Sequence, residues 1–148
     1  MKLAKQSLDA GLSTNNIQPM LRFYQDEVGL PFEELLATGG GGRQHRHGLN
    51  GSVLKINENR APLVEGAPTG YQRLHIVTPR VTSPTETADP DGNALRLLPP
   101  EGAARWIEVD VALADIEAGR RHYGTALGFE ALGEDTFRCG TTVIHLLH

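Results

Sequence analysis

The most constraining feature of this sequence is a segment that occurs twice. One copy covers residues 8–29 and the other covers residues 107–128. Their alignment needs no gap and matches Asp9 with Glu108, Asn16 with Asp115, Tyr24 with Tyr123, and Gly29 with Gly128. A repeat that keeps its register over this length predicts two copies of one supersecondary unit.

Each copy predicts a strand followed by a helix. From Ile107 to Leu113, apolar and polar residues alternate, which is typical of a half-buried strand. Asp115 suits the N-cap of the next helix, because its carboxylate can accept hydrogen bonds from free amides, and Gly128 suits the helix end. In the first copy Asn16 and Gly29 take these two roles. Apolar residues at helical spacing predict the buried stripes: Ile17, Met20, Leu21, Tyr24 and Val28 in the first helix, and Ile116, Tyr123 and Leu127 in the second.

Short strand patterns follow each helix, at residues 32–37, 43–49 and 52–57 in the first copy and at 129–132, 136–139 and 142–147 in the second. The middle of the chain predicts two more strands, at 71–77 and 94–98, with irregular structure from Pro79 to Pro84. The later of these strands follows a tight turn, Asp89-Pro-Asp-Gly-Asn93. The whole pattern predicts an α+β fold with two clear helices.

Charge and composition argue against several classes of protein. The formal charge of -4 does not suit a broad nucleic-acid surface, which needs a basic stripe. The single cysteine, Cys139, rules out an intramolecular disulfide framework. No apolar run suits a signal peptide or a membrane helix, which needs about 20 residues. We therefore expect a cytoplasmic protein with neither nucleic-acid nor membrane partners.

Three motifs in order resemble the glyoxalases and bleomycin-resistance proteins, members of the vicinal-oxygen-chelate superfamily together with extradiol dioxygenases. They are the Phe-Tyr helix and Gly-Leu-Pro-Phe of residues 23–32, the turn of residues 89–93, and His-Tyr-Gly-Thr-Ala-Leu-Gly-Phe at 122–129. The resemblance implies paired βαβββ modules whose curved sheets form a half-barrel around a pocket. The modules would cover residues 1–58 and 104–148. Residues 59–103 would hold a linker and a degenerate module that lacks its helix.

The resemblance also implies where a site would lie. In metal-using members, a divalent metal is held by first-strand and last-strand residues of each module. The corresponding positions here are Asp9 and Glu108 in first strands, Lys55 and His145 in last strands, and Arg96, with Arg73 or His75, in the middle segment. Lys and Arg carry protons and positive charge and cannot serve as ligands. A complete four-ligand metal site is therefore not expected, and the best metal candidates are Glu108 and His145.

Each candidate also has a structural interpretation. Glu108 would be a salt-bridged strand residue, His145 a hydrogen-bonded core histidine, and Asp9 a surface residue. Lys55 and Arg96 lie in otherwise apolar strands, where an unpaired buried charge is costly. We expect each of these two cations to face water, a carboxylate or an anionic ligand.

Three aromatic side chains complete the set of candidates. His45 and His47 are two residues apart and share a strand face, so they are candidates for ligand contact and a weak seed for a metal site. Trp106 is predicted to be a pocket wall or an interface residue.

The sequence leaves three functions open. The first is a glyoxalase/bleomycin-resistance-like protein that binds a small organic molecule in a cleft between curved sheets. The second is a metal-dependent lyase, isomerase or dioxygenase acting on a substrate with vicinal oxygens, with Glu108 and His145 as catalytic residues. The third is a structural or interaction domain with a vestigial pocket. Because two modules and a remnant leave sheet edges uncovered, a homodimer is also predicted.

Overall fold

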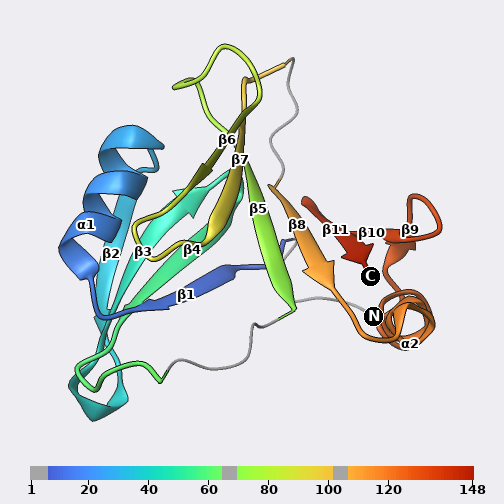
Figure 1. Ribbon diagram of the computed structural model, residues 1–148, viewed down its shortest axis with the longest axis horizontal. Coiled ribbons are helices and arrows are strands. Elements are labelled where there is room, and N and C mark those ends of the chain that lie inside the picture. Colours follow the sequence, from blue (N-terminus) through green and yellow to red (C-terminus); the bar gives the residue numbers. More distant parts are fainter. Residues whose placement is uncertain (1–6, 65–69, 102–106) are drawn as a thin grey trace.

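The first copy of the repeat folds as a strand, a helix and three strands. The computed structural model describes residues 7–64, 70–101 and 107–148 (Figure 1). In the first copy the elements are β1 (Ala10–Thr14), α1 (Ile17–Arg22), η1 (Phe23–Glu27), β2 (Phe32–Ala37), η2 (Gly39–Gly41), β3 (Arg43–Leu49) and β4 (Ser52–Glu58). They form a four-stranded sheet, sheet A, in the order β1-β4-β3-β2, and β1 runs parallel to β4.

The second copy has the same topology. Its elements are β8 (Ile107–Ala112), α2 (Ile116–Arg120), η3 (Arg121–Ala126), β9 (Glu130–Ala131), β10 (Thr136–Cys139) and β11 (Thr142–Leu147). The first strand, β8, again pairs in parallel with the last strand, β11. In both copies the α-helix continues into a π-helical segment, η1 or η3, at the same place in the repeat. The duplication in the sequence is therefore a duplication of structure.

The middle segment adds three strands and, within its described residues, no helix. These are β5 (Tyr71–Val77), β6 (Thr85–Ala88) and β7 (Ala94–Leu98). β5 is parallel to β7, as first and last strands are in the complete units, and it is antiparallel to β8. This joint makes a seven-stranded sheet, sheet B, in the order β6-β7-β5-β8-β11-β10-β9. The sequence did not predict β6, because its four residues lack an apolar alternation and lie at the sheet edge.

The helix ends follow the sequence in part. Asp115 caps α2, since its carboxylate accepts a hydrogen bond from the Ala118 amide at 2.8 Å. Gly29 and Gly128 end the helical segments with positive φ angles of 83° and 65°. The cap predicted at Asn16 is wrong: its side chain makes no capping bond and its ψ of 52° is not extended.

The helical segment of residues 17–28 packs in a core shared by both sheets. Met20, Tyr24 and Val28 are fully buried. Their core cluster joins Leu54 and Ile56 of sheet A to residues of sheet B that include Leu74, Ile76, Leu95, Leu97 and Ile107. The helical segment of the first unit thus shares a core with β5 and β7 of the middle segment. The second helical segment packs in a smaller cluster with Phe137, Ile144 and Leu146, which Leu8 of the first unit also contacts.

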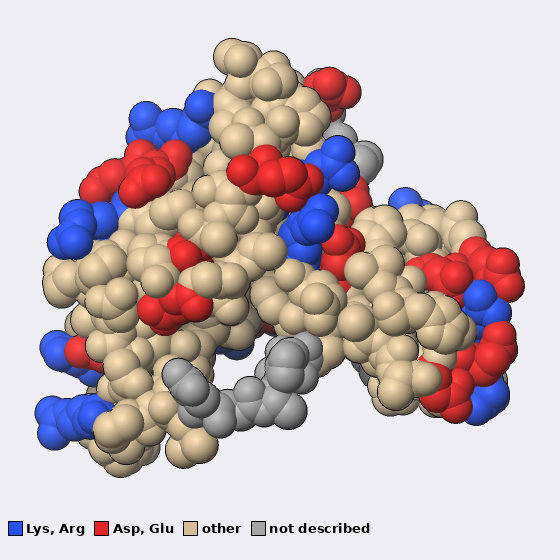
Figure 2. Space-filling model, viewed as in Figure 1, with Lys and Arg blue, Asp and Glu red and all other residues tan. Residues whose placement is uncertain are grey.

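These elements confirm the α+β class with paired βαβββ units, and the sheets do not close into a barrel. On the face seen in Figure 2, acidic and basic side chains are interspersed. Among the described residues, no helix is both long and apolar enough to span a bilayer.

Candidate functional site

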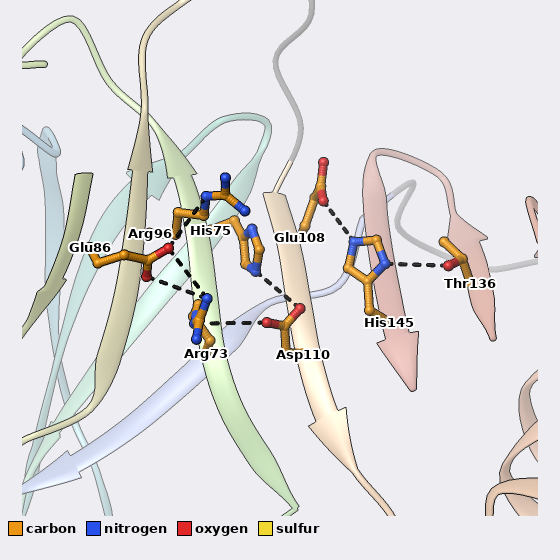
Figure 3. Close-up of polar contacts among 8 residues, drawn as sticks. All are labelled: Arg73, His75, Glu86, Arg96, Glu108, Asp110, Thr136 and His145. Atoms are coloured by element: carbon orange, nitrogen blue, oxygen red, sulfur yellow. Dashed lines mark hydrogen bonds and ion pairs between the residues drawn. The ribbon is translucent and has the colours of Figure 1, made fainter. Parts of the chain in front are cut away.

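One face of sheet B carries a cluster of titratable and polar side chains (Figure 3). Strand β8 explains how the cluster arises. Its alternate residues Ile107 and Val109 pack in the main core, so Glu108 and Asp110 point to the opposite side. The members of this polar face are Arg73 and His75 on β5, Glu86 on β6, Arg96 on β7, Glu108 and Asp110 on β8, Thr136 on β10, and His145 on β11.

Strand register arranges these side chains in two rows across the sheet. The first row is Glu86, Arg96, His75 and Glu108, each directly opposite the next on the neighbouring strand. The second row is Arg73, Asp110, His145 and Thr136. Acidic and basic groups are mixed in both rows. Close opposite charges lower the cost of removing each charge from water, so a partly buried charged face can persist here.

Glu108 and His145 form the central pair of the polar face. The Glu108 Oε2 atom lies 2.7 Å from His145 Nε2. On the other side of the ring, Thr136 Oγ1 lies 3.3 Å from His145 Nδ1. Both members remain partly open to solvent, with side-chain exposures of 24% for Glu108 and 31% for His145. A molecule entering from solvent can therefore reach this pair.

His75 and Asp110 form a second pair beside the first. Their Nε2 and Oδ1 atoms are 3.0 Å apart, and the two side chains are only 9% and 12% exposed. The rings of His75 and His145 have centroids 6.0 Å apart. Arg73 Nε lies 3.9 Å from Asp110 Oδ2. The His75–Asp110 pair is thus shielded from solvent, whereas the Glu108–His145 pair is accessible.

A pocket of about 320 Å³ opens over Glu108 and His145. Its lining combines polar and apolar side chains: Glu108, Thr136, Arg138 and His145 with Leu132, Thr141 and Val143, together with Gly140. An ionised Glu108 can only accept, so in the neutral ring Nε2 carries the hydrogen and Nδ1 can accept from the Thr136 hydroxyl. The two partners thus hold the His145 ring in one orientation beside the pocket.

The polar face does not fit the divalent metal that the family resemblance implies. Of the positions on this face that the resemblance names, Arg73 and Arg96 offer no lone pair. His75 Nε2 lies 3.0 Å from Asp110 Oδ1, and His145 directs Nε2 at Glu108. Within the described ranges, no group of three His, Cys, Asp or Glu side chains is placed to hold a metal ion. The donor set instead forms two separate histidine–carboxylate pairs.

The other residues selected from sequence lie elsewhere. Asp9 and Lys55 are ion-paired with each other, with Oδ2 and Nζ 2.7 Å apart, at sheet A. His45 and His47 share a face, as predicted, but it is the buried α1 side of sheet A and not the polar face of sheet B. Trp106 lies outside the described residues. The structure therefore brings together Arg73, His75, Arg96, Glu108 and His145, and separates them from Asp9, Lys55, His45 and His47.

The sequence interpretation missed four members of the polar face and its pocket. Asp110 could have been found, because it shares the strand face of Glu108 at period two. Glu86 lies on the unrecognised β6. Thr136 and Arg138 are on β10, and only the pairing of β10 with β11 brings them beside His145.

His47 has a structural role that gives a testable pH dependence. It is fully buried, and its Nε2 lies 2.9 Å from the Gln25 Nε2. Burial, and then the neighbouring His45, hold the pKa of His47 below its ordinary value of 6.5. The unfolded chain therefore binds this proton at a higher pH than the folded chain does. The free energy of unfolding should be largest above about pH 6.5 and should decrease as the pH falls through the folded pKa.

We expect urea denaturation between pH 7.5 and 5.5 to show this loss, and a His47→Gln variant to lose less stability over the same range. His122→Gln is the matched control, because His122 is exposed on η3. Its pH dependence should equal that of the wild-type protein. An equal pH dependence in His47→Gln and His122→Gln would exclude the buried histidine as the cause.

Comparison with known proteins supports the fold. No protein-family model matches the sequence, and no curated protein sequence is similar to it. A proposed dioxygenase from Bacillus subtilis superimposes with a TM-score of 0.68 at 16% identity, over 97% of this chain and 64% of that protein. The YycE protein of Bacillus subtilis, of unknown function and proposed as a glyoxalase/fosfomycin resistance protein, superimposes with a TM-score of 0.50 at 14% identity. This second match covers 67% of our chain and 93% of YycE.

The chain thus spans less than two thirds of the length of the dioxygenase. At these identities the likeness concerns the fold and not the activity. Both structures share with this chain the architecture that the duplicated βαβββ units build. The chain has the fold of the vicinal-oxygen-chelate superfamily, as its sequence motifs predicted.

Proposed function

We propose that this protein binds a small organic molecule in the pocket over Glu108 and His145. One observation carries the proposal: Glu108 and His145, two candidates that the sequence places on different strands, line one pocket of about 320 Å³. This volume is near the lower end of ligand sites, which typically enclose about 300–1,000 Å³. The function is that of a glyoxalase/bleomycin-resistance-like binding protein.

The pocket lining suggests the class of molecule. Leu132 and Val143 supply apolar surface, and Arg138 supplies a cation at the rim, where it also pairs with Glu130 at 2.6 Å. The His145 ring supplies a hydrogen-bonding group next to a carboxylate. A small molecule with an apolar body and an oxygen-bearing polar end suits this lining.

A thermal-shift screen of small carbonyl, hydroxy-acid and phenolic compounds tests this proposal. A compound that binds only the folded chain raises the melting temperature. We expect the shift to disappear in His145→Gln, which keeps a polar side chain but cannot share a proton with Glu108. His122→Gln, at an exposed position on η3, should retain the full shift.

Two results would contradict the proposal. One is a screen in which no compound shifts the melting temperature at millimolar concentration, which would favour the alternative of a structural domain with a vestigial pocket. The other is an equal shift in His145→Gln and in wild type, which would place the ligand elsewhere. A metal-dependent lyase, isomerase or dioxygenase has less support, because no three His, Cys, Asp or Glu side chains of the described residues are placed to bind one metal ion. A cytoplasmic location and a homodimer remain predictions.

A further inference from the structure

A second pocket lies behind the polar face of sheet B. Its volume is about 260 Å³, and its lining comes from the start of β1, from β5, β8 and β11, and from η3. Alternate residues of β8 face the two pockets: Glu108 lines the one described above, whereas Ile107 and Val109 line this one. The name seam pocket is used for it, since it lies at the border of the two hydrophobic clusters.

The two hydrophobic clusters meet at the seam pocket without filling it. Its lining residues Ala10 and Val109 pack against the main cluster, whereas Leu8 and Tyr123 pack against the smaller one. The lining is mostly apolar, and within the described ranges Asp9 is its one charged residue. An engineered apolar cavity of about 150 Å³ in another protein binds benzene. The seam pocket therefore has room for a substituted single ring.

A bulge in β5 turns Tyr71 toward the seam pocket. In a regular strand Tyr71 would share the polar face with Arg73, because residues two apart lie on one face. The pairing of β5 with β8 shifts between these two residues, so that Tyr71 is opposite Val111 while Arg73 is opposite Asp110. Such a shift re-aims a side chain. Tyr71 accordingly lines the seam pocket and packs against the main cluster.

The Tyr71 hydroxyl is a buried donor that the chain leaves unused. Among the described residues this hydroxyl has no hydrogen-bond partner. Burial, and then the carboxylates of Asp89 and Asp110, raise the pKa of Tyr71 above its ordinary value of 10. The hydroxyl therefore keeps its proton and can donate it in a hydrogen bond. A buried polar group without a partner is costly and rare, so an acceptor atom brought by a ligand would be stabilised here.

We propose that the seam pocket binds an uncharged molecule with a single ring and an acceptor oxygen, which takes a hydrogen bond from the Tyr71 hydroxyl. The apolar lining holds the ring. An anion is disfavoured, because Asp9 lines the pocket and because Asp89 and Asp110 act on the Tyr71 hydroxyl. Aryl ketones belong to this class of molecule. The site does not depend on the ligand proposed above, which would lie on the opposite face of sheet B.

Three probes with a common phenyl ring test this chemistry: acetophenone, ethylbenzene and benzoate. Amide chemical shifts of the isotope-labelled chain measure both the affinity and the place of binding. Acetophenone should shift the amides of Gly11, Val109 and Thr142 saturably, with a Kd below about 1 mM. In Tyr71→Phe its Kd should rise about tenfold, whereas the Kd of ethylbenzene, which has no oxygen, should stay within about twofold. Benzoate should bind the wild-type chain at least about tenfold more weakly than acetophenone.

Ala10→Leu tests the location of the site, because a larger side chain at this lining position occupies the pocket. It should abolish the binding of acetophenone and of ethylbenzene. Ser13→Leu is the matched control, since it adds the same side chain at an exposed position of the same strand, and it should keep both Kd values. Melting curves check that both variants fold, and Tyr71→Phe tests the site independently of them.

Several outcomes would overturn the proposal. Acetophenone that causes no saturable shift at millimolar concentration would show that the seam pocket is an unfilled gap between two cores. Shifts confined to the surroundings of His145 would place the molecule in the other pocket. An equal acetophenone Kd in Tyr71→Phe and in wild type would exclude the hydroxyl as the donor, and benzoate binding as tight as that of acetophenone would exclude the uncharged class.

Discussion

Asp89→Ala should lower the free energy of unfolding by about 3 kcal/mol, because it leaves buried donors without an acceptor. The Asp89 carboxylate is 5% exposed and accepts a hydrogen bond from the buried Tyr24 hydroxyl at 2.9 Å. It also accepts from the Asp91 amide at 3.0 Å and from the amide and side chain of Asn93 at 2.9 and 2.8 Å. One carboxylate thus ties the helical segment η1 to the turn before β7.

Asp91→Ala is the matched control for this prediction. Asp91 lies in the same turn, but its side chain is exposed, so the cost should stay within about 0.5 kcal/mol. Tyr24→Phe removes one of the four bonds and should cost about 1 kcal/mol. Urea denaturation of the three variants provides the measurement. Equal stabilities for Asp89→Ala and Asp91→Ala would show that the turn does not depend on the buried carboxylate.

Met20→Ala should also lower the free energy of unfolding by about 3 kcal/mol, because it opens a cavity in a core shared by two sheets. Met20 is fully buried in the cluster that contains Ile56 of sheet A and Leu97 of sheet B. Ile17→Ala, on the same helix, should cost about 1 kcal/mol, because Ile17 is only partly buried.

Hydrogen exchange distinguishes a shared core from two separate ones. In Met20→Ala, amide protection should fall together in β4 and β7, while β10 and β11 keep theirs, because their cluster around Phe137 is separate. A loss confined to β4 would contradict the shared core, and would mean that α1 stabilises sheet A alone.

Much of the local structure could be predicted from the sequence, because period-two and helical patterns act over short distances. Strands β2, β3, β5, β7, β10 and β11 have the predicted bounds, and the turn at 89–93 precedes β7 as expected. The alternation of residues 107–113 also predicted the strand that carries Glu108. What these patterns lack is any information on which sheets share a helix.

In the candidate site, too, the sequence predicted local features but not long-range packing. Glu108 and His145 were selected from the first-strand and last-strand positions that the family resemblance implies, and their contact follows from the parallel pairing of β8 with β11. His45 and His47 were correctly placed on one face, but the period of a strand does not say which face is buried. In the structure this face of sheet A is the packed one, and both histidines are buried. Long-range packing is therefore the part that one sequence does not supply.

The helical segment of the first unit and the strands of the middle segment share one core. Residues 17–28 contribute Met20, Tyr24 and Val28 to it, and residues 70–98 contribute Leu74, Ile76, Leu95 and Leu97. A fragment of residues 70–98 produced alone should therefore expose these four apolar side chains to water and should not fold.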